Sequence, residues 1–360
     1  MSFSFEQGPI RPPSEAKSLL IRVTRNCPWN RCAFCHIYEG EKFEIRPQDD
    51  IKEDIRKARA IADEIKEISW KLGERGEVSE RVVATIYRND DVYNDSFIGM
   101  AAWLYFGGES VFLQDANSLI MKSEDLINVL NFIRKTFPDV KRITSYCRSK
   151  TAKRKSVEEL KMLFNAGLSR IHIGMESGYD PILNFIKKGV TATEHIEGGR
   201  KIVESGISLS EYIMPGLGGE KWSCEHATET ARVINEINPD FIRLRSLVIR
   251  RNTDLHRLSE EGKFGPLGEE DVVREVRLFI NSLEGIESTI VSDHIYNLLE
   301  EVEGKLPGDK KRLLAVIDRY LGLNDEDRLI YRLGRRRGVY RKINDLKDKR
   351  TYNKLRNLQR

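Results

Sequence analysis

The stretch Leu19-Leu20-Ile21-Arg22-Val23 leads, after three residues, into Cys27-Pro28-Trp29-Asn30-Arg31-Cys32-Ala33-Phe34-Cys35. The apolar run predicts a buried strand, and the three cysteines fall within the nine residues of the loop that follows it. Three thiolates on one short loop can hold three irons of a cubane [4Fe–4S] cluster and leave the fourth iron without a protein ligand. Because an open iron can bind and reduce another molecule, the loop indicates chemistry.

Other uses of these cysteines stay open at this point. A structural zinc site needs four Cys or His ligands, and the fourth would have to be His36, whose neighbour Cys35 is already in the set. A disulfide is disfavoured because the chain has five cysteines and shows no secretory signal. Unliganded thiols are the third alternative.

Composition bounds the class of protein. The chain has 360 residues, of which 40% are hydrophobic and 32% charged, enough for one α/β barrel-sized domain plus an appendage. No stretch approaches the roughly 18 uninterrupted apolar residues of a membrane span. Residues 1–9 lack the charged and apolar blocks of a signal peptide. We therefore expect a protein without a membrane span in the reducing cytoplasm, which suits an oxygen-sensitive cluster.

Positive charge is concentrated at the carboxyl end. Residues 331–360 contain twelve Lys and Arg against two Asp, a net charge of +10, whereas the whole chain carries only +4. The first 330 residues therefore carry −6. Such a basic tail could neutralise nucleic-acid phosphates. A solvated basic helix, or one that packs on the acidic remainder of the chain, is the alternative.

Helix and strand patterns alternate after the cysteine loop. Apolar residues from Ile51 to Ile68 recur at steps of three and four and predict a long helix that Asp49 and Asp50 can cap, and residues 75–110 read as a helical insertion. Further strands are predicted at 111–113, 142–146, 170–175, 208–214 and 241–249. Helices are predicted at 123–136, 156–167, 191–206 and 223–238, two of them opened by capping boxes at Ser156 and Thr191.

Six strands separated by helical crossovers predict a parallel sheet with right-handed connections. The fold class that follows is α/β, a partial (β/α)6 TIM-like barrel with a mostly helical C-terminal extension, whose chemistry collects at the carboxyl ends of the strands. The predicted organisation is an N-terminal segment (1–17), the barrel (18–250), the extension (251–330) and the basic tail (331–360). A further strand is expected at 289–291 within the extension.

These features together resemble the radical S-adenosylmethionine (SAM) superfamily over residues 18–250, in the branch that contains oxygen-independent coproporphyrinogen oxidases and elongator-type proteins. The family signature places an aromatic residue just before the third cysteine, which Phe34 matches. Its commonest spacing has three residues between the first two cysteines, whereas this chain has four. The resemblance implies a [4Fe–4S] cluster on Cys27, Cys32 and Cys35, with SAM as the second cofactor.

The resemblance also implies SAM contacts. Glu176, in Ile171–Gly178, stands where the family places a polar contact to the ribose hydroxyls, and Lys188 stands where a cation meets the methionine carboxylate. Tyr212 and Met214 belong to the segment that flanks adenine and ribose. For the methionine amino group we expect the stretch after the second strand, with the candidates Gln114, Asp115 and Asn117 and with Asp115 as the charge partner. The alternative is Gly107-Gly108-Glu109, which otherwise reads as a turn.

Candidates for substrate contact or catalysis lie near the end of the barrel. Arg243 and Arg245 alternate along the sixth predicted strand, so both could bind an anionic group or pair with a core carboxylate. Asp293 and His294, with Asn297, could supply a proton donor or a substrate contact, or form a structural hydrogen-bonded cluster.

The resemblance implies that a one-electron donor of the flavodoxin or ferredoxin type reduces the cluster, that SAM is cleaved, and that a 5′-deoxyadenosyl radical abstracts hydrogen from a substrate. Three functional hypotheses follow. The substrate is a small metabolite, lipid or cofactor precursor; or it is RNA, bound through the basic tail; or the protein is a non-catalytic carrier of heme or a metal cofactor.

Overall fold

The computed structural model describes residues 3–89 and 93–358, so the ends of the predicted N-terminal segment and basic tail and the middle of the 75–110 insertion lie outside the described residues. The chain divides into two compact units. The first comprises Met1–Asn30, Ile37–Ile173 and Lys201–Ser208, and the second comprises Arg31–His36, Gly174–Arg200 and Leu209–Arg360. This division does not follow the boundaries at 250 and 330, and the domain organisation stays a prediction.

The first unit holds the early βα pairs and the insertion. Its strands are β1 (Leu19–Arg22), β2 (Thr24–Arg25), β3 (Glu44–Ile45), β4 (Ser110–Gln114), β5 (Arg142–Cys147) and most of β6 (Leu168–Glu176). Its helices are α1 (Gln48–Lys71), α2 (Glu80–Tyr87), α3 (Asp95–Tyr105), α4 (Ser123–Thr136), α5 (Ser149–Arg154) and α6 (Val157–Asn165), with short 3₁₀ turns η1 (Pro13–Glu15) and η2 (Ser118–Ile120).

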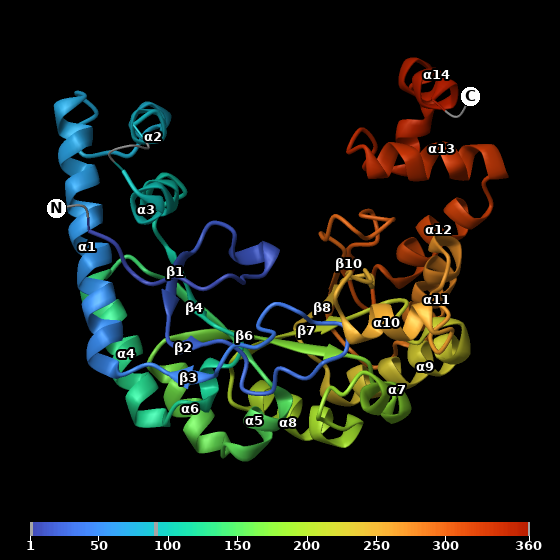
Figure 1. Cartoon of the computed structure of the whole chain (residues 1–360), viewed down its shortest axis with the longest axis horizontal. Helices are drawn as coiled ribbons and strands as arrows, with labels where there is room; N and C mark the ends of the chain where they lie inside the picture. Colours follow the sequence, from blue (N-terminus) through green and yellow to red (C-terminus); the bar gives the residue numbers. More distant parts are fainter. Residues whose placement is uncertain (1–2, 90–92, 359–360) are drawn as a thin grey trace. The chain divides into compact units, whose positions relative to one another are not determined.

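The second unit holds the later pairs and the extension. Its strands are most of β7 (Ser208–Ile213), β8 (Phe241–Leu244), β9 (Thr289–Val291) and β10 (Gly304–Lys305). Its helices are α7 (Asp180–Phe185), most of α8 (Ala192–Glu204), α9 (Gly219–Ile237), α10 (Asp254–Glu260), α11 (Glu269–Ser282), α12 (Lys310–Leu321), α13 (Asp325–Arg336) and α14 (Lys349–Asn357), with the 3₁₀ turn η3 (Ile343–Lys347). Figure 1 shows helices of both units flanking the strands.

Eight strands form one sheet in the order β1-β4-β5-β6-β7-β8-β9-β10. The pairs β1–β4, β4–β5 and β5–β6 are parallel, as are β7–β8 and β8–β9. At the end of this sheet, β10 runs antiparallel to its neighbour β9. Strands that follow one another in this order, joined by helices, are the (β/α) arrangement of a partial TIM-like barrel, so the predicted fold class is confirmed.

The periodic patterns place the core as expected, with one correction in detail. Ile51, Ile55 and Ile65 of α1 are fully buried, as the helical stripe predicted. The capping prediction is wrong, because Pro47 occupies the N-cap position and Asp49 and Asp50 lie in the first turn of the helix. Carboxylates there still favour the helix, since they face its positive end.

A second correction concerns the sixth predicted strand, 241–249. The strand β8 ends at Leu244, so Arg245 lies beyond it and does not alternate with Arg243 along a strand. The neighbours set this limit, because β7 ends at Ile213 and β9 at Val291. Beyond β8 only isolated bonds continue, from Arg245 N to Ile213 O at 3.0 Å and from Leu247 N to Pro215 O at 2.8 Å. The strand expected at 289–291 is confirmed as β9.

The carboxyl end is folded onto the extension. Helix α13 runs across the predicted boundary between residues 330 and 331. Tyr331, Tyr340, Ile343 and Leu355 are buried, and the Tyr331 ring stacks on Tyr340 with a centroid distance of 6.4 Å. None of the helices in the described ranges is long and apolar enough to cross a membrane.

Candidate functional site

A buried charge cluster lies where β6 and β7 end. Lys188 Nζ donates to Glu176 Oε1 at 2.9 Å, and both side chains are nearly buried, with 13% and 12% of their surface exposed. Glu176 is the last residue of β6 and has a left-handed backbone, with φ of 66°. Its carbonyl accepts a hydrogen bond from Met214 N at 3.0 Å. This backbone conformation is uncommon outside glycine and is often found at functional sites.

Glu211, on β7, completes this cluster, and sequence reasoning missed it. Its side chain is fully buried, and neither carboxyl oxygen has a hydrogen-bond partner among the described residues. Burial raises the pKa of Glu211 well above its usual value, the neighbouring Glu176 raises it further, and Lys188 opposes both. The sequence does contain a signal for this residue, because Glu211 is the only acid in the predicted strand and lies next to Tyr212, a predicted SAM contact.

The arrangement offers complementary chemistry to a zwitterionic nucleoside. Lys188 supplies a cation for a carboxylate, and Glu176 can accept hydrogen bonds from vicinal hydroxyls. Glu211 has a buried carboxyl group with unused hydrogen-bonding capacity, and such groups normally have a partner in proteins. These residues therefore fit the ribose and methionine ends of SAM, although their roles stay predictions.

Phe34 lies beside this cluster. The segment Arg31–His36 is held in the second unit by backbone bonds from Ala33 N to Ile186 O and from Leu255 N to Ala33 O, both at 2.8 Å. Lys188 Nζ is 5.7 Å from the centroid of the Phe34 ring. The structure thus brings together Phe34, Glu176 and Lys188, three of the residues that the sequence singled out.

Tyr212 and Met214 take different positions in the same region. Both side chains are buried, and Met214 packs in an apolar cluster with Ala33, Ile186 and Leu217. His226, on α9, bonds through Nε2 to the carbonyl of Met214 at 3.0 Å and through Nδ1 to Ser177 Oγ at 2.9 Å. The segment is therefore rigidly held, and its contact with adenine stays a prediction.

The residues expected to hold the methionine amino group lie at the end of β4 and just after it in the first unit, and each already has protein partners. Gln114 donates to the carbonyls of Gly8 and Ile10 at 2.9 and 2.8 Å. Asp115 is fully buried and pairs with Arg22 at 2.6 Å. Burial raises the pKa of Asp115, and Arg22 opposes that effect.

Asn117 donates to Thr151 Oγ1 at 2.8 Å and accepts from Arg148 N at 3.1 Å. The alternative, Glu109, lies before β4 and pairs with Lys141 at 2.5 Å, with both side chains at least half exposed. Glu109 is therefore at the amino end of β4. The cysteine loop follows β1 and β2 and so lies at the opposite, carboxyl ends of the strands. Among these residues Asp115 remains the predicted charge partner of the amino group.

Cys27 and Cys32 are half-buried, and Cys35 is exposed. In the described ranges no three His, Cys, Asp or Glu side chains are close enough together to hold a metal ion. The donor set itself fits an iron–sulfur cluster, because three accessible thiols on one loop can be deprotonated and drawn together as metal binds. Ligation by these cysteines stays a prediction.

Arg243 and Asp293 form a structural pair in the second unit. Arg243 is buried, donates to Ser210 Oγ at 3.1 Å and pairs with Asp293 at 3.0 Å. Asn297 holds Ser246 N at 2.9 Å and the Leu244 carbonyl at 2.7 Å. Whether these residues have only a structural role or also act on a substrate stays a prediction.

His294 lies next to that pair. Burial lowers the pKa of His294 to about 4, the positive charges of Arg245 and Arg250 lower it further, and Asp293 opposes them. At neutral pH the ring is therefore uncharged, which suits a hydrogen-bond acceptor better than a proton donor.

A cavity of about 530 Å³ opens beside the ends of β7 and β8 in the second unit. Aliphatic side chains of α11 and of the segments 244–248 and 295–302 form half of its lining. Arg335 and Arg336 are at one side of it. This volume is within the range of ligand pockets, roughly 300–1,000 Å³.

Known proteins provide an independent comparison. No protein-family model matches the chain. Over 279 residues it is 22% identical to the tRNA uridine(34) acetyltransferase of Methanocaldococcus jannaschii, covering 74% of this chain and 48% of the relative. Over 122 residues it is 24% identical to the protein of the same name from Methanocaldococcus infernus, covering 34% of this chain and 23% of the relative. The chain thus spans less than half the length of either curated relative.

Solved structures give matches of the same kind. The archaeal Methanocaldococcus infernus Elp3 with an N-terminal deletion is 17% identical with a TM-score of 0.41, covering 51% of this chain and 48% of that one. The coproporphyrinogen III oxidase HemN of Escherichia coli, a radical SAM enzyme, is 14% identical with a TM-score of 0.43, covering 73% and 52%. The chain is thus similar, at low identity, to a tRNA uridine(34) acetyltransferase, to an archaeal Elp3 and to a coproporphyrinogen III oxidase that is a radical SAM enzyme.

Proposed function

We propose that this chain is a radical SAM enzyme. The observation that carries the proposal is the cluster of Glu176, Lys188 and Glu211 at the ends of β6 and β7, with Phe34 of the cysteine loop against Lys188. Cys27, Cys32 and Cys35 would hold the [4Fe–4S] cluster. The bound cofactors would supply one-electron cleavage of SAM into methionine and a 5′-deoxyadenosyl group able to abstract hydrogen.

The residues of the chain bind and orient SAM in this proposal. Lys188 holds the methionine carboxylate, and Glu176 accepts hydrogen bonds from the ribose. Glu211 has a raised pKa, so its carboxyl group can be protonated and can both donate and accept a hydrogen bond. Burial excludes water from this cluster, which strengthens each electrostatic contact within it.

The first test is anaerobic. The protein is reconstituted with iron and sulfide, reduced with dithionite, and supplied with SAM, and 5′-deoxyadenosine is quantified. We expect product from the unchanged protein and from a Cys224→Ala control, since Cys224 is an exposed cysteine on α9 outside the loop. Cys32→Ala should abolish it. A protein that binds zinc and no cluster would overturn the proposal, and a reduced cluster without product would favour the carrier hypothesis.

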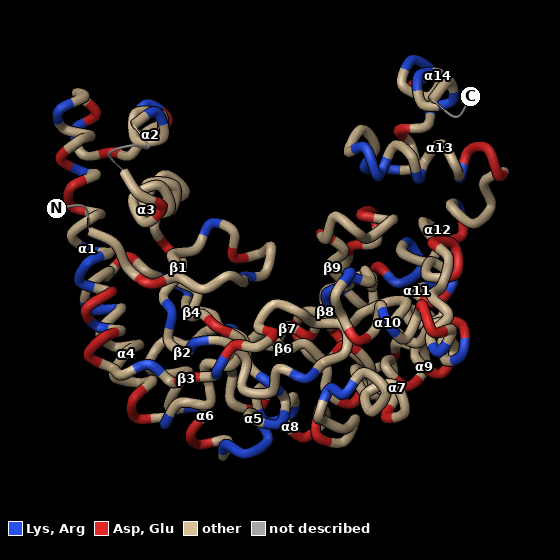
Figure 2. The backbone as a smooth tube through the Cα atoms, viewed as in Figure 1, with Lys and Arg blue, Asp and Glu red and all other residues tan. Residues whose placement is uncertain are grey.

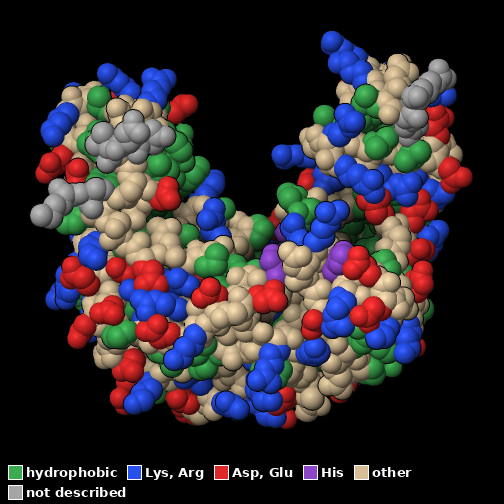
Figure 3. Space-filling view, in the orientation of Figure 1, with side chains coloured by type: hydrophobic (Ala, Val, Ile, Leu, Met, Phe, Trp, Pro, Cys, Tyr) green, Lys and Arg blue, Asp and Glu red, His purple; other side chains and the backbone are tan. Residues whose placement is uncertain are grey.

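We propose RNA as the substrate class, with a flavodoxin- or ferredoxin-type electron donor in a reducing cytoplasm. The support comes from the names of the curated relatives, which are tRNA uridine(34) acetyltransferases, and from the carboxyl end of this chain. Seven exposed cations there form no ion pair within the described ranges: Arg337, Arg341, Lys342, Lys347, Lys349, Arg350 and Lys354. Figures 2 and 3 show Lys and Arg gathered over α13 and α14.

Four further arginines of the tail, all within the described residues, are paired with acids. Arg332, Arg335 and Arg336 pair with Glu270, Glu300 and Glu269 at 2.8–3.1 Å, and Arg356 pairs with Glu326 at 2.7 Å. They attach α13 and α14 to the fold. The two acids of the tail, Asp345 and Asp348, accept hydrogen bonds from backbone N–H groups of the tail itself. The seven exposed cations are therefore free to meet phosphates.

The test for RNA measures affinity for unmodified tRNA transcripts as a function of salt. Replacing Lys342, Lys347, Lys349 and Lys354 with Gln should reduce the slope of log K against log salt by about 3 if all four contact phosphates. Lys66, Lys71, Lys122 and Lys135 are exposed lysines of the first unit, and their replacement with Gln is the charge-matched control. An unchanged slope in the first variant would exclude the tail as the RNA surface.

A small apolar substrate is the second candidate, favoured by the cavity beside β8. Val276 of α11 lines that cavity, and Val276→Trp would fill part of it. If this cavity holds the substrate, the variant should lose substrate-stimulated 5′-deoxyadenosine formation while keeping its affinity for tRNA. Unchanged stimulation would exclude the cavity.

A further inference from the structure

The three cysteines lie in a loop whose two ends are held together. The loop leaves β2 and returns through β3, where Thr24 pairs with Ile45 and Arg25 with Glu44 in a two-stranded sheet. One step further out, Asn26 Nδ2 donates to the Lys42 carbonyl at 2.7 Å. These contacts belong to the first unit and form the base of the loop.

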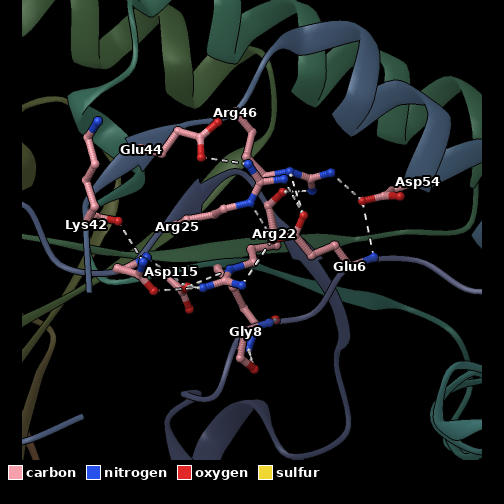
Figure 4. Close-up of polar contacts among 11 residues, drawn as sticks. Glu6, Gly8, Arg22, Arg25, Lys42, Glu44, Arg46, Asp54 and Asp115 are labelled. Atoms are coloured by element: carbon pink, nitrogen blue, oxygen red, sulfur yellow. Dashed lines mark hydrogen bonds and ion pairs between the residues drawn. The ribbon is translucent and has the colours of Figure 1, made fainter. Parts of the chain in front are cut away.

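One carboxylate gathers three arginines at this base. Glu6 accepts from Arg22 Nη1 at 3.0 Å and from Arg25 Nε and Nη2 at 2.7 and 2.6 Å. The same carboxylate pairs with Arg46 Nε at 3.3 Å. The three arginines come from the end of β1, from β2 and from the residue after β3, so Glu6 connects both ends of the loop (Figure 4).

Each arginine has a second acidic partner. Arg22 pairs with Asp115 at 2.6 Å, Arg25 with Glu44 at 2.7 Å and Arg46 with Asp54 at 2.8 Å. The Arg46, Asp54 and Asp115 side chains are at most 7% exposed, and the Glu6 side chain is 28% exposed. Removing one partner from such a network leaves the remaining charges poorly compensated. Hydrogen bonding to Arg25 is the main cause that lowers the pKa of Glu6, so Glu6 stays ionised at neutral pH.

The N-terminal segment that carries Glu6 is itself fixed. Glu6 N donates to Asp54 at 3.3 Å, and Gly8 N donates to Gln114 Oε1 at 2.8 Å. Gly8 lies against the buried pair, because a Cβ added there would be 2.1 Å from Asp115 Oδ1. The segment therefore delivers Glu6 to one position at the carboxyl ends of β1 and β4.

The network reaches the residue that precedes the first cysteine. Arg22 Nη2 donates to Asn26 Oδ1 at 3.2 Å, and Asn26 N donates to Asp115 Oδ2 at 3.3 Å. Arg25 is two residues before Cys27, so at most about 7 Å separates their Cα atoms. The network is therefore linked to the residue next to Cys27, a proposed cluster ligand.

We infer that Glu6 is a positioning residue for the cysteine loop. It fixes the base of the loop, and it supplies a negative charge near the proposed cluster. This inference rests on the proposed function. Glu6 gathers arginines that would otherwise repel one another and so presents Cys27 in one orientation. Since nearby charge helps to set the potential of an iron–sulfur cluster, Glu6 also keeps that potential low.

The first experiment needs no cluster. Hydrogen exchange of peptides covering residues 26–43 is compared in apo protein, in Glu6→Gln, and in Glu44→Gln as the control. Glu44 binds only Arg25 among these arginines, and its side chain is half exposed. We expect exchange about tenfold faster in Glu6→Gln, as for local opening after loss of a partly buried ion pair, and little change in the control. Equal rates in Glu6→Gln and wild type would overturn the inference.

The second experiment uses reconstituted protein and an EPR-monitored redox titration. Glu6→Gln should shift the midpoint potential to a more positive value, and Glu6→Asp, which keeps the charge, should restore most of it. An unchanged potential in Glu6→Gln would overturn the electrostatic role. If Glu6→Gln does not fold, Glu6→Asp decides both tests. We then expect hydrogen exchange in the loop to be faster than in wild type, and the midpoint potential to be close to that of wild type. A wild type that takes up no cluster would contradict the proposed function alone, because the exchange experiment still tests the loop base.

Discussion

Neighbouring lysines in this chain have very different surroundings. Lys187 pairs with Asp254 at 2.8 Å, and both side chains are exposed by more than 40%. Lys188 is nearly buried between Glu176 and the Phe34 ring. An exposed pair contributes little, whereas a buried cation among carboxylates determines what can bind there. We therefore predict that Lys188, and not Lys187, contributes to binding at the proposed site.

Lys188→Met is expected to weaken SAM binding at least thirtyfold, because truncating one partner of a buried charge pair costs about 2 kcal/mol or more. Equilibrium dialysis of SAM with the reconstituted protein measures the loss. Lys187→Met, with the same change one residue earlier, should bind as wild type does. Equal affinities for the two variants would remove Lys188 from the site.

Glu211 makes stability depend on pH. Its pKa is raised in the folded state, so the folded protein holds a proton that the unfolded chain releases. The contribution of Glu211 to the free energy of unfolding is fully present below the pKa that Glu211 has in the unfolded chain. That contribution decreases as the pH rises towards the pKa of Glu211 in the folded protein. Glu211→Gln should therefore be more stable than wild type at pH 8, with the advantage shrinking towards pH 4. Urea denaturation at several pH values measures this, and a constant difference would contradict it.

At the scale of elements, close backbone approach fixes α9 against the end of β6. A Cβ added to Gly178 would be 2.6 Å from the Glu229 carbonyl and 2.7 Å from Thr230 Cα, both on α9. Gly178 N also donates to Thr230 Oγ1 at 2.9 Å. The backbone of α9 cannot yield as a flexible side chain could. This contact holds His226 and Ser177 near Met214.

Gly178→Ala should reduce the free energy of unfolding by about 1–3 kcal/mol through overpacking. Gly99 is the matched control, because it is inside α3 with only the Gln7 side chain within 4 Å of an added Cβ. Gly99→Ala should stabilise the protein by about 0.5–1 kcal/mol, since alanine favours a helix. Urea midpoints compare the two. An unchanged midpoint in Gly178→Ala would contradict the overpacking argument, and a loss of stability in Gly99→Ala would contradict the argument for the control.

At the scale of the whole molecule, charge is unevenly distributed, and the basic end is structurally integrated. Tyr331 contacts both Tyr320 and Tyr340 with ring centroids at 5.6 and 6.4 Å. Arginines of α13 pair with acids at 269, 270 and 300. The basic tail is thus partly a packed helix on acidic partners, as one alternative held, and partly an unpaired cationic surface.

Deleting residues 331–360 should destabilise the protein by about 3–5 kcal/mol or more, the usual cost of losing a large buried aromatic side chain. The deletion cuts α13 and removes Tyr331 and Tyr340. The four-lysine variant of the tail should unfold within about 0.5 kcal/mol of wild type, because its changes are exposed. Thermal and urea unfolding compare both chains. A deletion as stable as wild type would show that the tail does not pack.

Much of the fold and part of the site followed from local patterns. The helix α4 has the predicted bounds, and β9 was expected from three residues. Strand ends were less accessible, since β8 stops where its neighbours stop and leaves Arg245 outside. Glu211 was missed because an acid in an apolar strand reveals its role only when Glu176 and Lys188 are seen beside it. Glu6 was missed because its three arginines are 16 to 40 residues away.

The sequence by itself determined the order of strands and helices, the parallel sheet, the spacing of Cys27, Cys32 and Cys35 that the proposal rests on, and the concentration of charge at the carboxyl end. Each depends on spacing within a few residues, which sequence displays directly. Only the tertiary structure decided which charges meet: Glu211 with Glu176, Glu6 with the arginines at the loop base, and α13 with its acidic partners. The reason is physical, because strand register and burial bring distant side chains together, and burial makes their charges matter.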